Sequence, residues 1–107
     1  MSDSDFLLRD IILHMKQDIN DIIQILQSYK VKKIALFGSY ARGDNNEKSD
    51  IDILIEPASR TTLFDMAGMQ IDLKASLKKS VDLITYGSIS PILKDNILKD
   101  EKVIYQI

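Results

Sequence analysis

The stretch IALFGSYARGDNNEKSDIDILIE, residues 34–56, decides the fold. It joins an apolar run that ends at Phe37 to a second run in which apolar and acidic side chains alternate. Short runs of this kind, bounded by glycine and polar loops, are typical of strands. Because strand residues two apart share a face, the isoleucines of the second run predict a buried face, and Asp50 and Asp52 lie on the opposite one. Packing alone gives no reason for that acidic pair.

Upstream of this stretch, the sequence predicts one long helix over residues 5–29, which Ser4 or Asp5 can cap. Apolar residues recur there at alternating spacings of four and three, at Leu8, Ile12, Met15, Ile19, Ile22, Leu26 and Tyr29. At about 1.5 Å per residue the helix would reach roughly 36 Å, which exceeds the width of a small domain. Either part of it contacts a partner, or it kinks near residues 14–18 and folds onto its own core.

Downstream, the pattern predicts a helix within residues 61–80, capped by Thr61 or Thr62 and weakened by Gly68 in its middle. A strand over residues 81–85, a short helix with Pro91 in its first turn and a closing strand over residues 102–107 follow. We therefore predict an α/β (α+β) fold, a small mixed sheet with helices packed on one face. Its 107 residues suit a single domain, residues 1–107.

Composition excludes several classes of protein. Fourteen basic and sixteen acidic side chains give a net charge of -2, which argues against a broad basic surface for long nucleic acid. The absence of cysteine excludes disulfides and thiolate metal sites. No apolar run approaches the length that spans a membrane, and the acidic N-terminus does not resemble a secretory signal, so we expect a cytoplasmic protein.

The acidic pair is repeated on the third predicted strand, where Asp82 lies between Val81 and Leu83. If the second and third strands are neighbours, three carboxylates converge on the face that the helices leave free. Clustered carboxylates repel one another unless a cation intervenes, and a hard cation with oxygen ligands, above all Mg²⁺, resolves that conflict. The alternative is that these residues form the solvated side of an ordinary amphipathic sheet.

Gly38 and Ser39 follow the first strand directly and precede a predicted helical turn. Glycine lets a ligand approach the backbone, and Ser39 can cap the turn and offer its hydroxyl to a phosphate. The loop is not a P-loop, because Asp44 and Asn45 stand where Lys and Ser or Thr are required. Arg42 suits either a phosphate contact or a salt bridge to Asp44 or Glu47. Three tyrosines could each stack on a nucleotide base or pack in the fold, and the sequence does not distinguish the two roles. They are Tyr40, Tyr86 and Tyr105.

Gly38-Ser39, ten intervening residues, Asp50-Ile51-Asp52 and the later Asp82 resemble the nucleotidyltransferase signature of the DNA polymerase beta superfamily. The segments FGSYARGD and SDIDILI are most similar to those of the minimal nucleotidyltransferase (MNT) antitoxins that pair with HEPN toxins. The resemblance extends from the first strand to the closing residues. The long N-terminal helix is the part that the motif covers least.

This resemblance implies an enzyme that uses ATP and Mg²⁺ to transfer AMP to a tyrosine hydroxyl of a cognate HEPN ribonuclease toxin. Asp50 and Asp52 would hold two metal ions, and Asp82 would complete the site as a ligand or proton acceptor. Gly38, Ser39 and Arg42 would bind the nucleotide phosphates, and the first helix would contact the partner or a second copy. Two alternatives are an antitoxin that blocks the toxin by binding alone, and a nucleotidyltransferase for a small molecule such as an aminoglycoside.

Overall fold

Four strands form one mixed sheet in the computed structural model, which describes residues 3–45 and 48–107 and, in the first helix, side chains from residue 13 onward. Their order across the sheet is β3-β2-β1-β4. The strands are β1 (Lys33–Phe37), β2 (Ile51–Glu56), β3 (Val81–Thr85) and β4 (Lys102–Gln106). β1 runs antiparallel to β2 and β4, whereas β2 and β3 are parallel. The second and third strands are therefore neighbours, which is the condition for their three carboxylates to converge.

Helices connect these strands as the sequence predicts. They are α1 (Asp3–Ser28), α2 (Gly38–Arg42), α3 (Leu63–Leu77) and α4 (Pro91–Lys99), with an unpredicted 3₁₀ turn η1 (Tyr86–Ser88). α3 is the crossover between the parallel strands, and a capping box between Thr62 and Asp65 begins it. Pro91 opens α4, where its missing N–H costs nothing. The mixed sheet and these helices confirm the predicted fold class.

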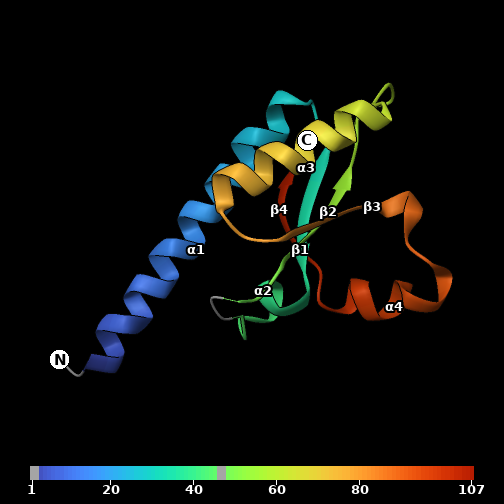
Figure 1. Cartoon of the computed structure of the whole chain (residues 1–107). Coiled ribbons are helices and arrows are strands. Elements are labelled where there is room, and N and C mark those ends of the chain that lie inside the picture. Colours follow the sequence, from blue (N-terminus) through green and yellow to red (C-terminus); the bar gives the residue numbers. More distant parts are fainter. Residues whose placement is uncertain (1–2, 46–47) are drawn as a thin grey trace.

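The main core lies between one face of the sheet and two helices, α1 and α3, which pack side by side (Figure 1). Ile22 and Leu26 of α1 and Met69 and Leu73 of α3 are fully buried there. A smaller cluster forms on the opposite face around Ala35, Phe37 and Leu54, and α4 packs against it through Ile97 and Leu98. Helix α4 thus covers part of the face that also carries Asp52 and Asp82, which the sequence pattern did not predict.

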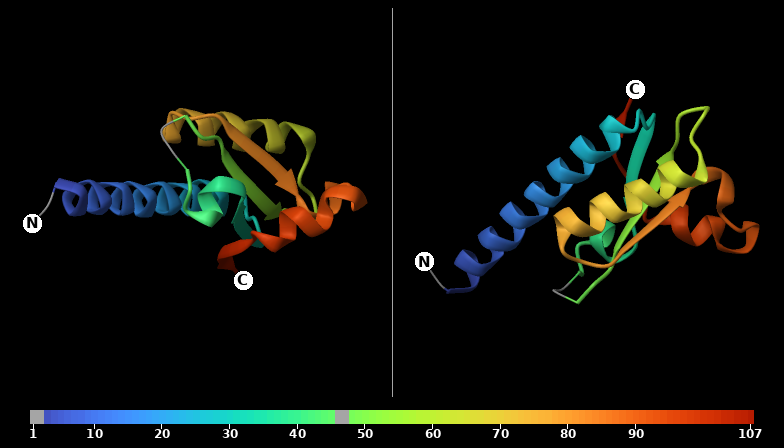
Figure 2. Two further views of the ribbon diagram at one scale, coloured as in Figure 1. Left: turned by 90° about the horizontal axis from the view of Figure 1, so that it is seen from below. Right: turned by 45° about the horizontal axis from the view of Figure 1, so that its top comes forward.

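Helix α1 runs unbroken for 26 residues, and its first half extends past the sheet rather than folding onto it (Figures 1 and 2). The molecule accordingly measures 51 × 30 × 25 Å. The helix begins at Asp3, so the predicted caps Ser4 and Asp5 are wrong and both lie inside it. The side chains of Leu8 and Ile12 lie outside the described residues, and the seam is partly or wholly buried from Met15 onward. Like every other described helix, α1 lacks the apolar length that crossing a membrane requires.

Gly68 has a packing role that explains why a helix tolerates it. A Cβ at this position would lie 2.7 Å from the Tyr29 hydroxyl oxygen. That hydroxyl donates a hydrogen bond of 2.6 Å to Asp72, which joins the turn after α1 to α3. Glycine therefore makes room for the contact between the two helices that close the core.

The residue that follows α3 allows a test of the cost of a left-handed backbone conformation. Lys78 has φ 55° and ψ 32°, a left-handed conformation, and its N–H bonds to the Lys74 carbonyl. Glycine adopts this conformation without the steric cost that a Cβ imposes. We expect Lys78→Gly to raise the free energy of unfolding by about 0.5–1 kcal/mol in urea titrations. Lys78→Ala is the control, because it removes the same side chain but keeps the Cβ; equal stabilities of the two variants would contradict this account.

Candidate active site

Asp52 lies where three parts of the chain meet. The parallel register sets it beside Asp82 of β3, and the antiparallel register sets it beside Phe37, the last residue of β1. Gly38 follows with φ +69°, and a Cβ at Gly38 would overlap the Oδ2 atom of Asp52. The glycine therefore serves two purposes, since it permits a left-handed turn and lets the carboxylate approach that turn.

The acidic residues interact electrostatically around Asp52. Its half-buried position raises the pKa of Asp52 to about 6, and the charges of Asp82 and Asp50 add to that shift. The Arg42 guanidinium acts in the opposite direction. Asp50, directly before β2, and Asp82 are both exposed. The structure thus brings the three predicted carboxylates into one region, with Asp52 at its inner end.

A cation fits the chemistry of this region, because it would offset the repulsion from Asp82 and Asp50 that adds to the effect of burial on the Asp52 pKa. Carboxylate oxygens are also the donors that hard divalent ions prefer. Over residues 3–45 and 48–107, however, no three acidic or histidine side chains are gathered as a ready-made set of metal ligands. Metal binding by Asp50, Asp52 and Asp82 therefore stays a prediction.

The turn after β1 is the five-residue helix α2, which begins at Gly38. Its N-cap is Phe37, so the prediction that Ser39 caps the turn is wrong: Ser39 is already helical. The Ser39 carbonyl instead accepts hydrogen bonds from the N–H groups of Gly43 and Asp44, which close the helix. Phosphate binding by Gly38 and Ser39 does not depend on that cap, and it stays a prediction.

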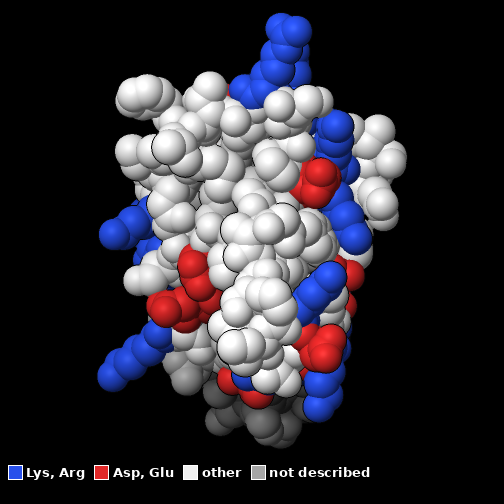
Figure 3. Space-filling view, turned by 90° about the vertical axis from the view of Figure 1, so that its right-hand side faces the viewer, with Lys and Arg blue, Asp and Glu red and all other residues white. Residues whose placement is uncertain are grey.

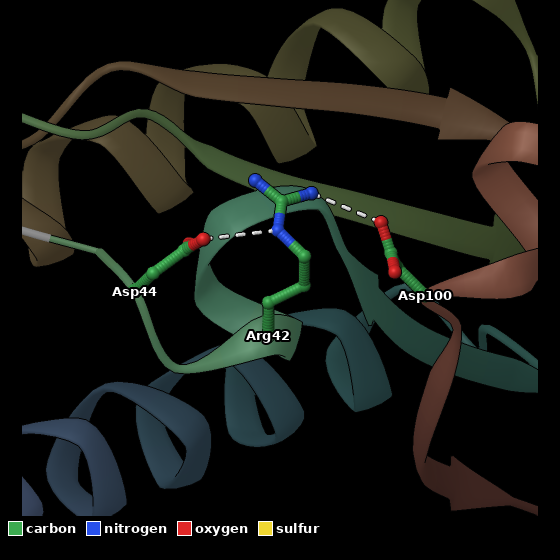
Figure 4. Close-up of polar contacts among 3 residues, drawn as sticks. All are labelled: Arg42, Asp44 and Asp100. Carbon is green, nitrogen blue, oxygen red and sulfur yellow. Dashed lines mark hydrogen bonds and ion pairs between the residues drawn. The ribbon is translucent and has the colours of Figure 1, made fainter.

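Arg42 joins two loops beside this region (Figure 4). Its Nε lies 3.1 Å from Asp44 Oδ2 and its Nη1 lies 2.9 Å from Asp100 Oδ2. The predicted salt bridge to Asp44 is confirmed, the one to Asp100 was not predicted, and Glu47 lies outside the described residues. Because Arg42 also influences the pKa of Asp52, its guanidinium is near the acidic region. A phosphate contact by Arg42 stays a prediction.

The three tyrosines all pack. Tyr40 is 3% exposed, Tyr105 packs against the main core, and Tyr86 packs on the smaller cluster. The Tyr86 hydroxyl also donates a hydrogen bond of 2.7 Å to Glu101. Sequence reasoning missed the polar partners of Tyr40, which are Asp18 and Lys79, because nothing local marks contacts over 22 and 39 residues.

Acidic and basic side chains are interspersed on the side of the molecule shown in Figure 3, around a largely uncharged centre. No continuous basic patch covers this view, which includes the side on which α4 lies. Nucleic-acid backbones are bound through clustered Lys and Arg, so this face does not suit a long nucleic acid.

Comparison with known proteins identifies relatives of the chain. The family model described as "Polymerase beta, Nucleotidyltransferase" matches residues 20–107. A Methanocaldococcus jannaschii protein named "Putative protein adenylyltransferase MJ0435" is 47% identical over 79 residues, which cover 74% of this chain and 85% of that protein. The match to the family model begins within α1, so the part of that helix that extends past the sheet precedes it.

Solved structures with the same fold include toxin–antitoxin complexes. A toxin–antitoxin with AMP-PNP matches with a TM-score of 0.72 and 30% identity, over 83% of this chain and 73% of that one. A complex of a tri-AMPylated Shewanella oneidensis HEPN toxin with its MNT antitoxin matches with a TM-score of 0.69 and 26% identity. This second match covers 87% of this chain and 73% of the other.

Proposed function

The chain belongs to the polymerase beta nucleotidyltransferase family, and from that premise we propose that it is an MNT antitoxin that transfers AMP from ATP to a tyrosine hydroxyl of a cognate HEPN ribonuclease toxin. The observation that carries the proposal is the position of Asp52, between Asp82 and the glycine turn. The relatives that carry AMP-PNP or an AMPylated toxin support the choice of nucleotide and acceptor. The proposed reaction takes place in the cytoplasm, where both ATP and a ribonuclease toxin are present.

In this reaction the tyrosine oxygen attacks the α-phosphorus of ATP. A new phosphorus–oxygen bond forms, the bond to the bridging oxygen breaks, and pyrophosphate leaves. Bound Mg²⁺ would supply charge stabilisation at the attacking and leaving oxygens. Asp50 and Asp52 would hold the ions, and Asp82 would either add a ligand or accept the proton of the hydroxyl. Gly38 and Ser39 hold the β- and γ-phosphates through the turn that begins α2.

The first half of α1 is the part of the chain best placed to contact the toxin or a second copy. It extends past the sheet, and Leu13 at its inner limit is 62% exposed. The sequence carries further apolar residues before it. Because the chain has no cysteine, a single Leu13→Cys variant allows site-specific cross-linking. A cross-link to the toxin or to a second copy would support this contact; recovery of the uncross-linked chain from the assembled complex would oppose it.

The test of the proposed function uses the purified chain, labelled ATP, Mg²⁺ and the co-encoded partner. We expect the label on a partner tyrosine and loss of ribonuclease activity. Neutralisation of the ribonuclease without label would favour an antitoxin that acts by binding alone. Formation of a labelled small product, such as a modified aminoglycoside, without any protein partner would favour the small-molecule alternative.

The pH dependence of transfer should follow Asp52. A carboxylate with a pKa of about 6 is largely protonated at pH 5, so about a tenth of the molecules hold it ionised there. We expect kcat/KM to rise roughly tenfold between pH 5 and pH 7.5, with a midpoint that moves lower as Mg²⁺ increases, because the cation competes with the proton. A flat profile from pH 5 to pH 7.5 at low Mg²⁺ would contradict this assignment.

The same shift fixes the sign of the stability effect. The folded-state pKa of Asp52, about 6, lies above the ordinary value of 3.8, so the folded chain binds the proton more tightly than the unfolded chain. Without Mg²⁺, this group therefore stabilises the fold fully below about pH 4, and that stabilisation is lost as the pH rises through about 6. Thermal unfolding with and without Mg²⁺ measures it: the gain from Mg²⁺ should be larger at pH 7.5 than at pH 5.

A further inference from the structure

Tyr40 makes three polar contacts from inside the fold. It is 3% exposed, and its hydroxyl donates a hydrogen bond of 2.9 Å to Asp18 Oδ2. The same oxygen accepts a hydrogen bond of 2.8 Å from Lys79 Nζ, which also lies 5.2 Å from the centre of the Tyr40 ring. A hydroxyl has one proton to donate and lone pairs to accept with, so both bonds are satisfied and together they fix its direction.

These three residues come from three parts of the chain: α1, α2 and the loop before β3. Asp18 lies on α1 and is itself only 7% exposed. Tyr40 follows Ser39 in α2. Lys79 lies just before β3, and the neighbouring Ser80 carbonyl accepts a hydrogen bond of 2.9 Å from the N–H of Ile51, between Asp50 and Asp52. One hydroxyl thus connects the glycine turn to the backbone that carries the acidic residues.

A five-residue helix does not hold its own position, because so short a helix is not stable without tertiary contacts. The exposed end of α2 is restrained by Arg42, whose contacts are open to solvent and therefore weak. The buried contacts of Tyr40 act at the other side of the turn, one residue from Ser39 and two from Gly38. A buried Asp18 without its donor would be costly, so the hydroxyl is held firmly in place.

We propose that Asp18, Tyr40 and Lys79 form a positioning network for nucleotide transfer, in which the Tyr40 hydroxyl sets the glycine turn at its working distance from Asp50, Asp52 and Asp82. This inference rests on the proposed function. None of the three residues is a catalytic residue. They act through Gly38 and Ser39, which hold the phosphates, and a misplacement of those groups by about 1 Å costs about a hundredfold in rate.

The chain offers a matched control. Tyr29→Phe removes a tyrosine hydroxyl that also bonds to an aspartate, Asp72, but it does so between the turn after α1 and α3, away from the glycine turn. Tyr40→Phe removes the hydroxyl and keeps the ring that Lys79 covers. We expect Tyr40→Phe to lower the thermal unfolding midpoint more than Tyr29→Phe does, because the Tyr40 hydroxyl bonds to a buried aspartate and the Tyr29 bond is exposed. We expect kcat to fall roughly ten- to hundredfold for Tyr40→Phe and to stay within about twofold for Tyr29→Phe, with the KM for ATP less affected in both.

A conservative variant separates positioning from charge. Asp18→Asn keeps an oxygen that accepts from the Tyr40 hydroxyl, whereas Asp18→Ala does not, so Asn should restore most of the kcat that Ala loses. Lys79→Met, on a residue that is only partly buried, removes the donor and serves as a second test should Tyr40→Phe fail to fold. We expect Lys79→Met to lower kcat more than it changes the KM.

Two measurements test the network separately from the proposed function: the rate of transfer of labelled AMP from ATP to the partner, and the binding of ATP and Mg²⁺ by calorimetry. Suppose that the wild-type chain binds ATP and transfers AMP, and that the Tyr40 and Lys79 variants have the same kcat as Tyr29→Phe. The network inference is then overturned, and the proposed function stands. If the wild-type chain neither binds nor transfers, both are overturned. A selective loss of kcat in the Tyr40 and Lys79 variants, with rescue by Asp18→Asn, supports the network.

Discussion

Replacing Asp50 and Asp52 together with Asn is expected to lower AMP transfer by about a thousandfold or more. Both residues keep their shape but lose the charge that holds the metal ions, and loss of several kcal/mol of charge stabilisation corresponds to such a factor. The folded chain should be at least as stable as the wild type, because Asp50 and Asp52 repel each other and Asp82. Initial rates of labelled AMP transfer and thermal unfolding of the same samples measure the two effects.

A double variant that loses transfer activity but keeps or gains stability would indicate a functional acidic cluster. The solvated side of an ordinary sheet would not show this combination. Asp95→Asn is the control, since Asp95 is exposed on α4 and lies far along the chain from the acidic region. Its transfer rate should stay within about twofold of the wild type. Undiminished transfer by the double variant would remove these carboxylates from the mechanism. Unchanged neutralisation of the toxin by the same variant would favour a binding antitoxin.

The second large effect is expected from Gly38→Ala. The added Cβ would overlap Asp52 Oδ2, and the φ of +69° disfavours any side chain. Either Asp52 moves or the turn moves, so the phosphates and the metal-binding carboxylate lose their alignment. We expect a loss of transfer of about a hundredfold or more, together with a loss of about 1–3 kcal/mol in the free energy of unfolding.

Gly43→Ala, at the residue that caps the same short helix, separates the steric overlap from the backbone conformation. Gly43 has φ +81°, but a Cβ there meets nothing within 4 Å. This variant should therefore lose about 1 kcal/mol of stability and keep transfer within a few-fold of the wild type. If Gly38→Ala were as active as Gly43→Ala, the close approach of Asp52 to the turn would have no bearing on the reaction.

Local patterns in the sequence predicted most of the fold. The alternation in residues 51–55 gave the buried face of β2, and Thr62 and Pro91 marked the starts of α3 and α4. The repeat of that alternation around Asp82 placed a third carboxylate on the same face, provided that β2 and β3 pair, and the structure shows that they do. Each of these signals arises within a few residues, where backbone periodicity and capping determine the structure.

Features that depend on long-range contacts could not be predicted in this way. The bond from Arg42 to Asp100 joins residues 58 apart, and the Tyr40 hydroxyl connects residues 22 and 39 positions away. Gly68 reads as a weak point in a helix until Tyr29 is seen beside it. These contacts depend on which residues become neighbours in the folded chain, and no periodic pattern in a single sequence indicates them.

Intact-mass spectrometry of the partner protein, after incubation with this chain, ATP and Mg²⁺, tests the central claim most directly. The account predicts that the partner gains one or more AMP groups on tyrosine, and that the Asp50→Asn, Asp52→Asn double variant adds none. A partner that keeps its original mass while the wild-type chain silences its ribonuclease activity would contradict the account.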